Sequence, residues 1–240
     1  MRPLTDHEKQ VYKDQDEVLQ IFSEIEGFNY ILSGGTALAR FYFHHRFSED
    51  LDFFLDGLDF SFATIEKYIQ ILRSKGMTCD LSGRTDKKGL LKVASYTVTK
   101  NTAIKVDFIE DPFTGMWPPE KRSSDSGHAV LVDSLDAIVY KKLFSLMEQW
   151  THAAQVSRIK DLFDLAYYHE KKRSLVDFLH QCRANHVEFD EEKLILIFAS
   201  IDAKKLEQTS INKTAFADLS KLEKIFQSIA TMLVKEGINP

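Results

Sequence analysis

Acidic side chains in the first half of the sequence are spaced so that they could bind metal ions. In Asp50-Leu51-Asp52-Phe53, the alternation of a β-strand puts both aspartates on one face and the apolar side chains on the other. A second candidate strand, residues 103–109, sets Asp107 opposite an apolar face in the same way. If the two strands are neighbours in a sheet, Asp107 completes a cluster of three carboxylates.

Such a cluster suits two-metal phosphoryl transfer. Mg²⁺ prefers oxygen ligands and is usually held by one or two carboxylates together with phosphate groups of the substrate. One metal ion would activate an attacking hydroxyl, and the other would hold a triphosphate. Two other interpretations compete with this one. The Asp-x-Asp pattern often occurs by chance, and surface strands often carry acidic residues that favour solubility.

A glycine turn precedes the acidic strand. Gly34 and Gly35 follow a short apolar segment, and Thr36 opens a predicted helix. The free N–H groups at a helix N-terminus favour a phosphate, and glycine lets the backbone approach closely. Two adjacent glycines are also typical of an ordinary turn, so both interpretations stay open. Arg46, between the turn and the acidic strand, could reach the nucleotide or form a salt bridge with Asp50.

The second half of the sequence offers a lysine on an apolar helical face. Within residues 135–150, Lys142 falls in the middle of the apolar stripe. A lysine there needs an anionic partner, such as a triphosphate, or a stem that carries its ammonium group to water. On the next helix, residues 158–169, Asp161 lies nearer the apolar stripe than Asp164 does. We therefore expect Asp161 to face a cleft and Asp164 to be solvated.

These side chains require strands in the first half of the chain and helices in the second. Alternating or short apolar segments predict strands, and amphipathic segments predict helices. The expected strands are residues 30–32, 51–55, 77–81, 90–98 and 103–109. The expected helices are residues 14–26, 36–43, 62–75, 135–150, 158–169, 175–185, 191–201 and 215–235. The changeover near residue 125 indicates an α/β domain, residues 1–125, and a helical domain, residues 126–240.

Composition narrows the class of protein. The chain has 240 residues, with 31 Lys plus Arg, 36 Asp plus Glu and a net charge of -5. No apolar run approaches the roughly 18 residues of a membrane-spanning helix, and the N-terminus shows no secretory signal. Cys79 and Cys182 match no metal-binding spacing. We expect a soluble cytoplasmic protein without membrane contact, which meets nucleic acid only through a local basic patch.

Four segments of the chain form a combination that is more specific than any one of them. They are Gly34-Gly35-Thr36-Ala37-Leu38, Arg46-Phe47-Ser48-Glu49-Asp50-Leu51-Asp52-Phe53, Lys142-Leu143 and Lys160-Asp161-Leu162-Phe163-Asp164-Leu165. In order and approximate spacing they resemble the AbiEii/AbiGii-type toxin nucleotidyltransferases, a branch of the DNA polymerase β-like nucleotidyltransferase superfamily. The resemblance covers residues 30–168, and the chain beyond residue 175 matches only as generic helices.

The resemblance implies a fold and a reaction. The fold would be an α/β nucleotidyltransferase core with a mixed β-sheet flanked by helices, followed by a C-terminal helical domain that closes the nucleotide cleft. The reaction would transfer a nucleoside monophosphate from an NTP to an acceptor hydroxyl with Mg²⁺, and two ions are expected. RNA, with tRNA first, would be the acceptor. The chain would be the toxin of a toxin–antitoxin or phage-defence pair, with an antitoxin protein as its partner. Transfer to a small molecule or a protein, and an inactive binding module, are the alternatives.

The site assignments combine this resemblance with the positions of the residues. By resemblance, Asp50 and Asp52 would bind metal, and Asp107 joins them on the argument from strand alternation. Gly35 and Thr36 would lie against the triphosphate. The hydroxyl that many superfamily members take from a serine would be supplied by Thr36 or be absent. Lys142 would bind phosphate, and Asp161 would match the acid of a later motif. The expected catalytic residues are Asp50, Asp52, Asp107, Lys142 and Asp161, and the expected nucleotide-binding residues are Gly34, Gly35, Thr36, Arg46 and Lys142.

Overall fold

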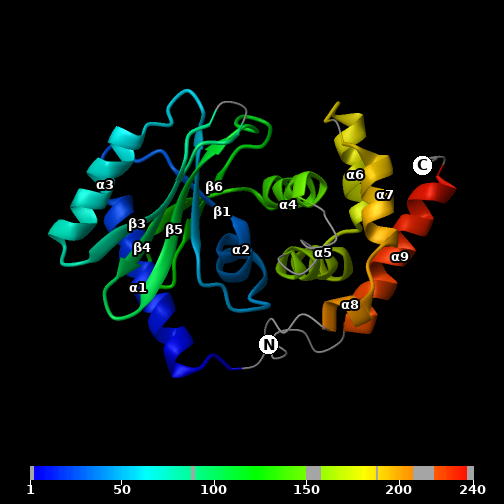
Figure 1. Ribbon diagram of the computed structural model, residues 1–240, viewed down its shortest axis with the longest axis horizontal. Coiled ribbons are helices and arrows are strands. Elements are labelled where there is room, and N and C mark those ends of the chain that lie inside the picture. Colours follow the sequence, from blue (N-terminus) through cyan, green and yellow to red (C-terminus); the bar gives the residue numbers. More distant parts are fainter. Residues whose placement is uncertain (1–2, 88–89, 150–157, 188, 208–218, 237–240) are drawn as a thin grey trace. The chain divides into compact units, whose positions relative to one another are not determined.

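The computed structural model describes residues 3–87, 90–149, 158–187, 189–207 and 219–236 (Figure 1). The chain divides into two compact units, Met1–Ile138 and Val139–Pro240. The described part of the first unit contains a seven-stranded sheet, and that of the second unit is helical. The expected succession of an α/β part and a helical part is confirmed.

The sheet of the first unit is mixed. Its strands lie in the order β3-β4-β5-β2-β1-β7-β6; β2 is parallel to β5 and β1 to β7, and the other neighbours are antiparallel. The strands are β1 Ile31–Ser33, β2 Leu51–Asp56, β3 Thr78–Thr85, β4 Val93–Thr99, β5 Ala103–Asp111, β6 Glu120–Ser123 and β7 Ala129–Val132. The helices of this unit are α1 Asp6–Ser23, α2 Gly34–Ala37, the π-helix η1 Leu38–Phe43 and α3 Phe62–Ser74.

One face of the sheet is apolar and covered. α1 and α3 lie on that side, whereas α2 lies on the opposite side (Figure 1). Phe53 of β2 and Phe108 of β5 are buried on the covered face, and their rings stack with centroids 5.8 Å apart. Phe22 of α1 packs edge-on against Phe53. Because full burial of such a side chain contributes about 1.5–3 kcal/mol, this face holds the unit together and leaves the other face to carry polar groups.

α1 begins at Asp6, well before the expected start at residue 14. Thr5 and Glu8 form a capping box, in which the Glu8 N–H donates to the Thr5 hydroxyl and the Thr5 N–H donates to the Glu8 carboxylate. Apolar periodicity does not predict this start, because the capping box is a signal of two polar residues and not part of an apolar stripe. Farther along α1, the buried Asp14 carboxylate accepts hydrogen bonds from backbone N–H groups of the β4–β5 turn.

β1 leads directly into the glycine turn. Gly34 begins α2 with a positive φ of 70°, and η1 follows α2 directly in the chain. The helical segment ends before His44, which adopts the left-handed conformation with φ 50°. The helix expected over residues 36–43 is therefore present, and it begins at the glycines rather than after them.

β6 and β7 were not predicted from the sequence. β7 is parallel to β1, and the N–H of Asp133, just after β7, donates to the Leu32 carbonyl at 2.9 Å. The hydroxyl of Tyr42 in η1 donates to the Asp133 carbonyl at 2.6 Å. Because β7 completes the sheet, the structural division falls after Ile138, later than the residue 125 expected from the sequence.

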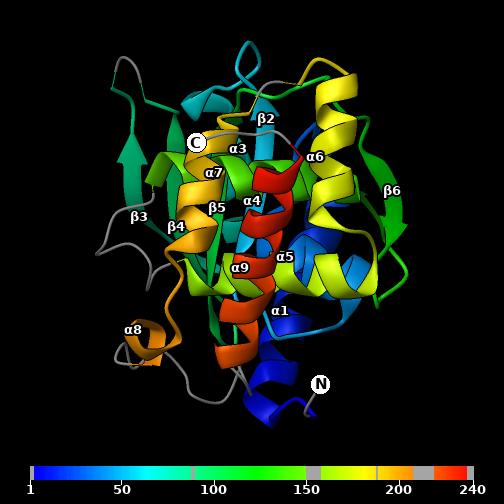
Figure 2. The same ribbon diagram turned by 90° about the vertical axis from the view of Figure 1, so that its right-hand side faces the viewer.

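The second unit is built around its last helix. α9 packs against α5, α6, α7 and α8, and the rings of Phe198 and Phe226 lie 4.9 Å apart between α7 and α9 (Figure 2). α4 begins in the first unit and continues into the second. Trp150 and residues 215–218, which were expected in helices, lie outside the described residues. The helices are α4 Leu135–Gln149, α5 Ile159–Lys171, α6 Leu175–Ala184, α7 Glu191–Ala199, α8 Ala203–Glu207 and α9 Leu219–Lys235.

No helix in the described ranges is both long enough and apolar enough to cross a membrane. The expectation that the helical unit closes a nucleotide cleft stays a prediction.

Candidate active site

A row of polar residues crosses the face of the sheet that lies opposite α1 and α3, which we call the open face. Asp52 of β2 and Asp107 of β5 are register partners in the parallel pair. Ser33 of β1 is the partner of Asp52, and Ser95 of β4 is the partner of Asp107. Because register partners project from the same face, all four side chains lie opposite the apolar layer. Strand alternation thus correctly indicated that Asp52 and Asp107 would share a face, and Asp50 directly precedes β2.

Asp107 has one oxygen that is engaged and one that is not. Its side chain is only 11% exposed, and Oδ2 lies 2.5 Å from the Lys105 ammonium nitrogen. Oδ1 is buried and has no hydrogen-bond partner among the described residues. A buried carboxylate oxygen without a partner is costly unless a ligand completes it, and a hard divalent cation is a suitable ligand.

The glycine turn packs directly against the Asp52 carboxylate. A Cβ atom at Gly34 would collide with Asp52 Oδ2, and Gly34 has a positive φ as well. A Cβ atom at Gly35 would collide with the Arg46 guanidinium and would lie 3.0 Å from Ser48 Oγ. Only glycine allows these approaches, so the turn is more than an ordinary connection: it brings an acidic and a basic side chain to the start of α2.

Thr36 has a different role from the one expected. Its side chain is fully buried, and its hydroxyl donates to the backbone carbonyl of Asp50. That hydrogen bond fixes the chain just before β2 and so helps to orient Asp50 and Asp52. The assignment of Thr36 as a nucleotide-binding residue stays a prediction, and its hydroxyl is engaged by the backbone.

Arg46 is a buried cation beside the turn. It is 7% exposed, and its Nη1 donates to the Phe47 carbonyl at 3.0 Å. The nearby Arg40 is also buried, and its Nη2 forms ion pairs with Asp16 and Asp125. Arg46 is therefore the basic side chain that the fold presents to the Gly35 backbone, where a phosphate would need a positive charge.

The charges of the three aspartates converge on Lys105. Burial by itself would lower the pKa of Lys105, but the hydrogen bond to Asp107 and the negative charges of Asp107, Asp50 and Asp52 outweigh it and raise the pKa. The three carboxylates therefore act on one cationic group. A positive charge at this place is favoured, as a metal site requires.

The carboxylates do not form a preassembled metal centre. No three His, Cys, Asp or Glu side chains are gathered closely enough for one in the part of the chain that the structure describes. The donors nevertheless fit a hard cation, because they are carboxylate oxygens in register and Asp107 Oδ1 is buried without a partner. Metal binding by Asp50, Asp52 and Asp107 stays a prediction with this structural support.

The second unit has its own charged cluster. Lys142 Nζ on α4 lies 2.5 Å from Asp161 Oδ1 and 2.9 Å from Asp164 Oδ2 on α5. Arg158 Nη1 lies 3.1 Å from the other Asp161 oxygen. The Asp164 side chain is 0% exposed, so the expectation that it is solvated is wrong. The charge of the buried Lys142 ammonium is instead balanced by both aspartates, which is the anionic partnership that a lysine on an apolar face requires.

Ser33, Ser95 and Lys105 were not singled out as site residues from the sequence. All three lie on the same face as the aspartates, and Ser33 is 1% exposed with no hydrogen-bond partner for Oγ among the described residues. The N–H of Glu110 donates to the Lys92 carbonyl, so the alternation of the ladder makes Ser95 and Asp107 a non-hydrogen-bonded pair, in which side chains approach closely. The two-residue period of each strand carried this signal, but only the register shows which strands are neighbours.

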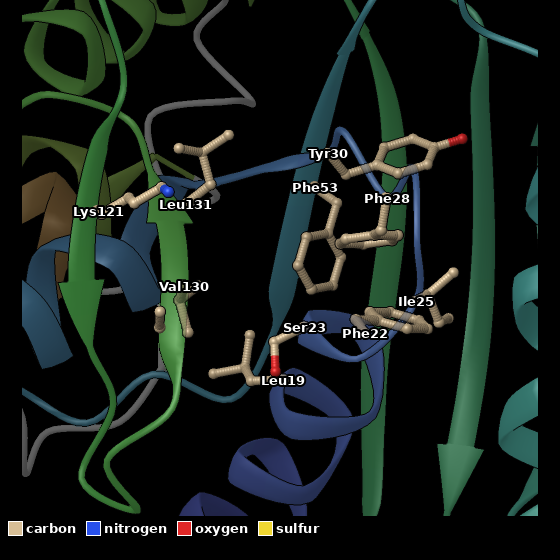
Figure 3. A pocket seen from close by; sticks show the side chains of 11 residues that line it. Leu19, Phe22, Ser23, Ile25, Phe28, Tyr30, Phe53, Lys121, Val130 and Leu131 are labelled. Atoms are coloured by element: carbon tan, nitrogen blue, oxygen red, sulfur yellow. The ribbon is translucent and has the colours of Figure 1, made fainter.

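The covered side of the first unit contains a separate apolar cavity of about 320 Å³ (Figure 3). Its walls come from α1, the following loop, β2 and the β6–β7 pair, with Phe22, Phe53 and Val130 among the lining residues. Because the lining is largely apolar and belongs to the side opposite the aspartates, this cavity does not suit a triphosphate.

A mixed sheet with two aspartates in register beside a glycine turn, followed by a helical unit, is the arrangement of a nucleotidyltransferase. The chain belongs to the family described as nucleotidyl transferase AbiEii toxin, type IV toxin–antitoxin system, whose sequence profile matches residues 20–236. The family resemblance seen in the motifs is confirmed, and the protein is an enzyme of the nucleotidyltransferase class.

Solved structures share the fold of the whole chain. A candidate nucleotidyltransferase from H. pylori superposes with a TM-score of 0.61 at 18% identity and covers 97% of each chain. MenT4, a nucleotidyltransferase toxin from Mycobacterium tuberculosis, superposes with a TM-score of 0.62 at 16% identity, over 93% of this chain and 84% of MenT4. No curated protein matches the sequence significantly. At these identities the structural likeness concerns the fold alone.

Proposed function

We propose that the protein transfers a nucleoside monophosphate from an NTP to an acceptor hydroxyl in a reaction that depends on Mg²⁺. The observation that carries this proposal is the pair Asp52 and Asp107, in register on the open face of the sheet, with Asp107 Oδ1 buried and unpartnered among the described residues. Asp50, Asp52 and Asp107 are the proposed metal ligands. Two ions are expected, because one would serve the attacking hydroxyl and the other the leaving phosphates.

The chemistry is an in-line displacement. The acceptor oxygen forms a bond to the α-phosphorus, the bond from that phosphorus to the bridging oxygen breaks, and pyrophosphate leaves. The hydroxyl proton passes to solvent. Bound Mg²⁺ supplies Lewis-acid activation and neutralises the developing charge. In this proposal the chain's own contribution is to position these groups.

The remaining site residues are proposed to bind phosphate or to orient the metal ligands. Gly34 and Gly35 leave room for the triphosphate at the start of α2, and Arg46 supplies positive charge beside Gly35. Thr36 holds the Asp50 backbone. On the second unit, Lys142 pairs with Asp161 and Asp164, and it is proposed to bind phosphate in addition to these two carboxylates, with Asp161 orienting its ammonium group.

We propose RNA as the acceptor, with tRNA as the first candidate, and a cytoplasmic toxin role with a cognate antitoxin as partner. The support is membership of the AbiEii toxin family together with the fold shared with MenT4, a nucleotidyltransferase toxin. The net charge of -5 is compatible with RNA if contact is local and if metal ions offset the three aspartates.

The test is transfer of label by the purified full chain. Each NTP, labelled at the α-phosphate, is incubated with Mg²⁺ and total tRNA, and labelled RNA is separated on a gel. Wild type should label tRNA, and Asp52→Ala should lower the rate by about 10³-fold, since metal-based stabilisation is worth several kcal/mol. Asp59→Ala, at an exposed aspartate after β2, is the matched control and should retain the wild-type rate.

Three outcomes would contradict the proposal or a part of it. Equal rates for Asp52→Ala and wild type would remove Asp52 from the metal site. Label that appears only when tRNA is replaced by protein or by a pool of small metabolites would change the acceptor class. No transfer to any acceptor, together with undetectable Mg²⁺-dependent NTP binding in calorimetry, would instead indicate an inactive binding module.

A further inference from the structure

The Lys105 ammonium group occupies a position beside the Asp107 carboxylate that would be unfavourable for a cation if Asp107 bound a metal ion. It is two residues before Asp107 on β5, so both side chains project from the open face. Its ammonium nitrogen is 2.5 Å from Asp107 Oδ2, and half of its side chain is exposed. The opposing residue on β4 is Thr97, which carries no charge. The electrostatic surroundings of Lys105 are therefore set by the aspartates.

The two oxygens of Asp107 have unequal surroundings. Oδ2 is taken by Lys105, whereas Oδ1 is buried without a partner in the described part of the chain. A divalent cation on this carboxylate would come within a few ångströms of the lysine ammonium, and like charges at that separation repel. Lys105 has a flexible stem and is already half in water, so it can withdraw from Oδ2.

We propose that Lys105 is a built-in counter-ion of Asp107 that competes with the divalent metal and must leave the carboxylate when the metal binds. The inference rests on the proposed function, because it takes Asp107 as a metal ligand. Lys105 is thus a positioning residue: it holds the third carboxylate and keeps the metal affinity low. Its removal should strengthen metal binding, the opposite of what loss of a ligand or of a structural contact would do.

The probe is Mn²⁺ alone, titrated into the full chain and followed by the electron paramagnetic resonance signal of the free ion. Lys105→Met should bind Mn²⁺ about two- to fivefold more tightly than wild type, as expected for the loss of a partly exposed competing ion pair. Lys105→Arg keeps the charge and should bind as wild type does. Lys92→Met is the charge-matched control, because the Lys92 ammonium pairs with Glu110 of β5 at 2.9 Å and not with an aspartate of the site, and it should leave the affinity unchanged.

A second pair of proteins isolates the role of Asp107. In the Asp107→Asn background, Lys105→Met should produce less than half of the tightening that it produces alone, because the contested carboxylate has been removed. Lys105→Gln is measured beside Lys105→Met, and circular dichroism reports whether each variant is folded, so poor folding of one variant leaves the other as the test.

The results separate this inference from the proposed function. Unchanged or weaker Mn²⁺ binding by folded Lys105→Met or Lys105→Gln, with wild type still transferring nucleotide, overturns the counter-ion role and leaves the function standing. Equal tightening by Lys92→Met also overturns it, since the effect would then be one of overall charge. Absence of Mn²⁺ binding by wild type together with absence of nucleotide transfer would overturn both.

Discussion

The carboxylate of Asp52 fills the space that a side chain at position 34 would occupy. Gly34 directly follows β1 and begins α2, and Asp52 is the register partner of the preceding residue, Ser33. Because Gly34 and the Asp52 carboxylate lie so close together, the conformation of the turn and the direction of the Asp52 side chain depend on each other. The residue type at position 34 therefore acts on the site as well as on the backbone.

Gly34→Ala should lower nucleotide transfer by about 100-fold, because its methyl group would push the Asp52 carboxylate out of place and a misplacement of about 1 Å can cost that much. Gly27→Ala is a close control, since Gly27 also has a positive φ, 76°, and its added Cβ would meet nothing within 4 Å. Both variants should lose about 1–2 kcal/mol of unfolding free energy from backbone strain. Steady-state rates and urea denaturation check this, and equal activities of the two variants would contradict it.

The two hydroxyls beside the glycine turn should differ in their contribution to stability. Thr36→Val should lower the free energy of unfolding by about 1–2 kcal/mol, because the Asp50 carbonyl loses its donor. Ser33→Ala should change it by less than about 0.5 kcal/mol or raise it, because a buried hydroxyl without a partner is removed. Urea denaturation of both variants measures the difference. An equal loss in the two would show that Ser33 makes a stabilising contact.

The buried cluster of the second unit should be sensitive to loss of Asp164. Asp164→Ala should cost about 3 kcal/mol, because the buried Lys142 loses one of the two carboxylates that balance its charge. Asp177→Ala on α6 is the control, since Asp177 is exposed, and it should cost less than about 1 kcal/mol. Thermal and chemical denaturation would measure the free energy of unfolding that each variant loses. Similar losses for Asp164→Ala and Asp177→Ala would mean that Lys142 reaches water when Asp164 is removed.

Asp14 should make stability depend on pH. Burial alone would raise the pKa of Asp14, but hydrogen bonds from Asn101, Thr102 and Gln10 outweigh it and lower the pKa. A carboxyl whose pKa is lowered by folding stabilises the protein above its unfolded pKa of about 3.9, and this stabilisation is lost as the pH falls through the folded value. Asp14→Asn should therefore cost about 2–3 kcal/mol at neutral pH and progressively less below about pH 4.

Denaturant titrations at several pH values would measure how the difference in unfolding free energy between wild type and Asp14→Asn changes with pH. Asp59→Asn, at an exposed aspartate, is the control and should show no such trend. A gap for Asp14→Asn that stays constant with pH would mean that the amide replaces the carboxylate in every hydrogen bond.

Much of the fold could be predicted from periodicity, and the exceptions have physical causes. The strands around Asp52 and Asp107 and the helix around Lys142 alternate or repeat clearly, and they occur where expected. β6 is polar, and β7 is apolar but only four residues long, too short to show a strand period, so neither stands out until β1 is seen to pair with β7. The early start of α1 depends on the Thr5–Glu8 capping box and not on an apolar stripe.

Site residues were predictable where one strand or one helix decided the outcome. The shared face of Asp52 and Asp107 followed from alternation once β2 and β5 proved to be neighbours. The burial of Asp164 does not follow from a helical projection, which gives the direction of a side chain but not the width of the buried face. Here the carboxylate pairs with a buried lysine. The engagement of Thr36 by the Asp50 backbone depends on a contact between segments 14 residues apart, which no local pattern contains.

The two unlike faces of the sheet have a consequence for how the sequence can vary. Along β5, Val106 and Phe108 face the apolar layer, while the intervening Asp107 faces the open side. In a saturation-mutagenesis library scored separately for protein abundance and for nucleotide transfer, neighbouring codons of this strand should fall into different classes. Substitutions at Val106 and Phe108 would deplete the protein itself, whereas many substitutions at Asp107 would leave abundant but inactive protein. The alternation of the strand would then appear as a period of two codons in the effects of substitutions on protein abundance.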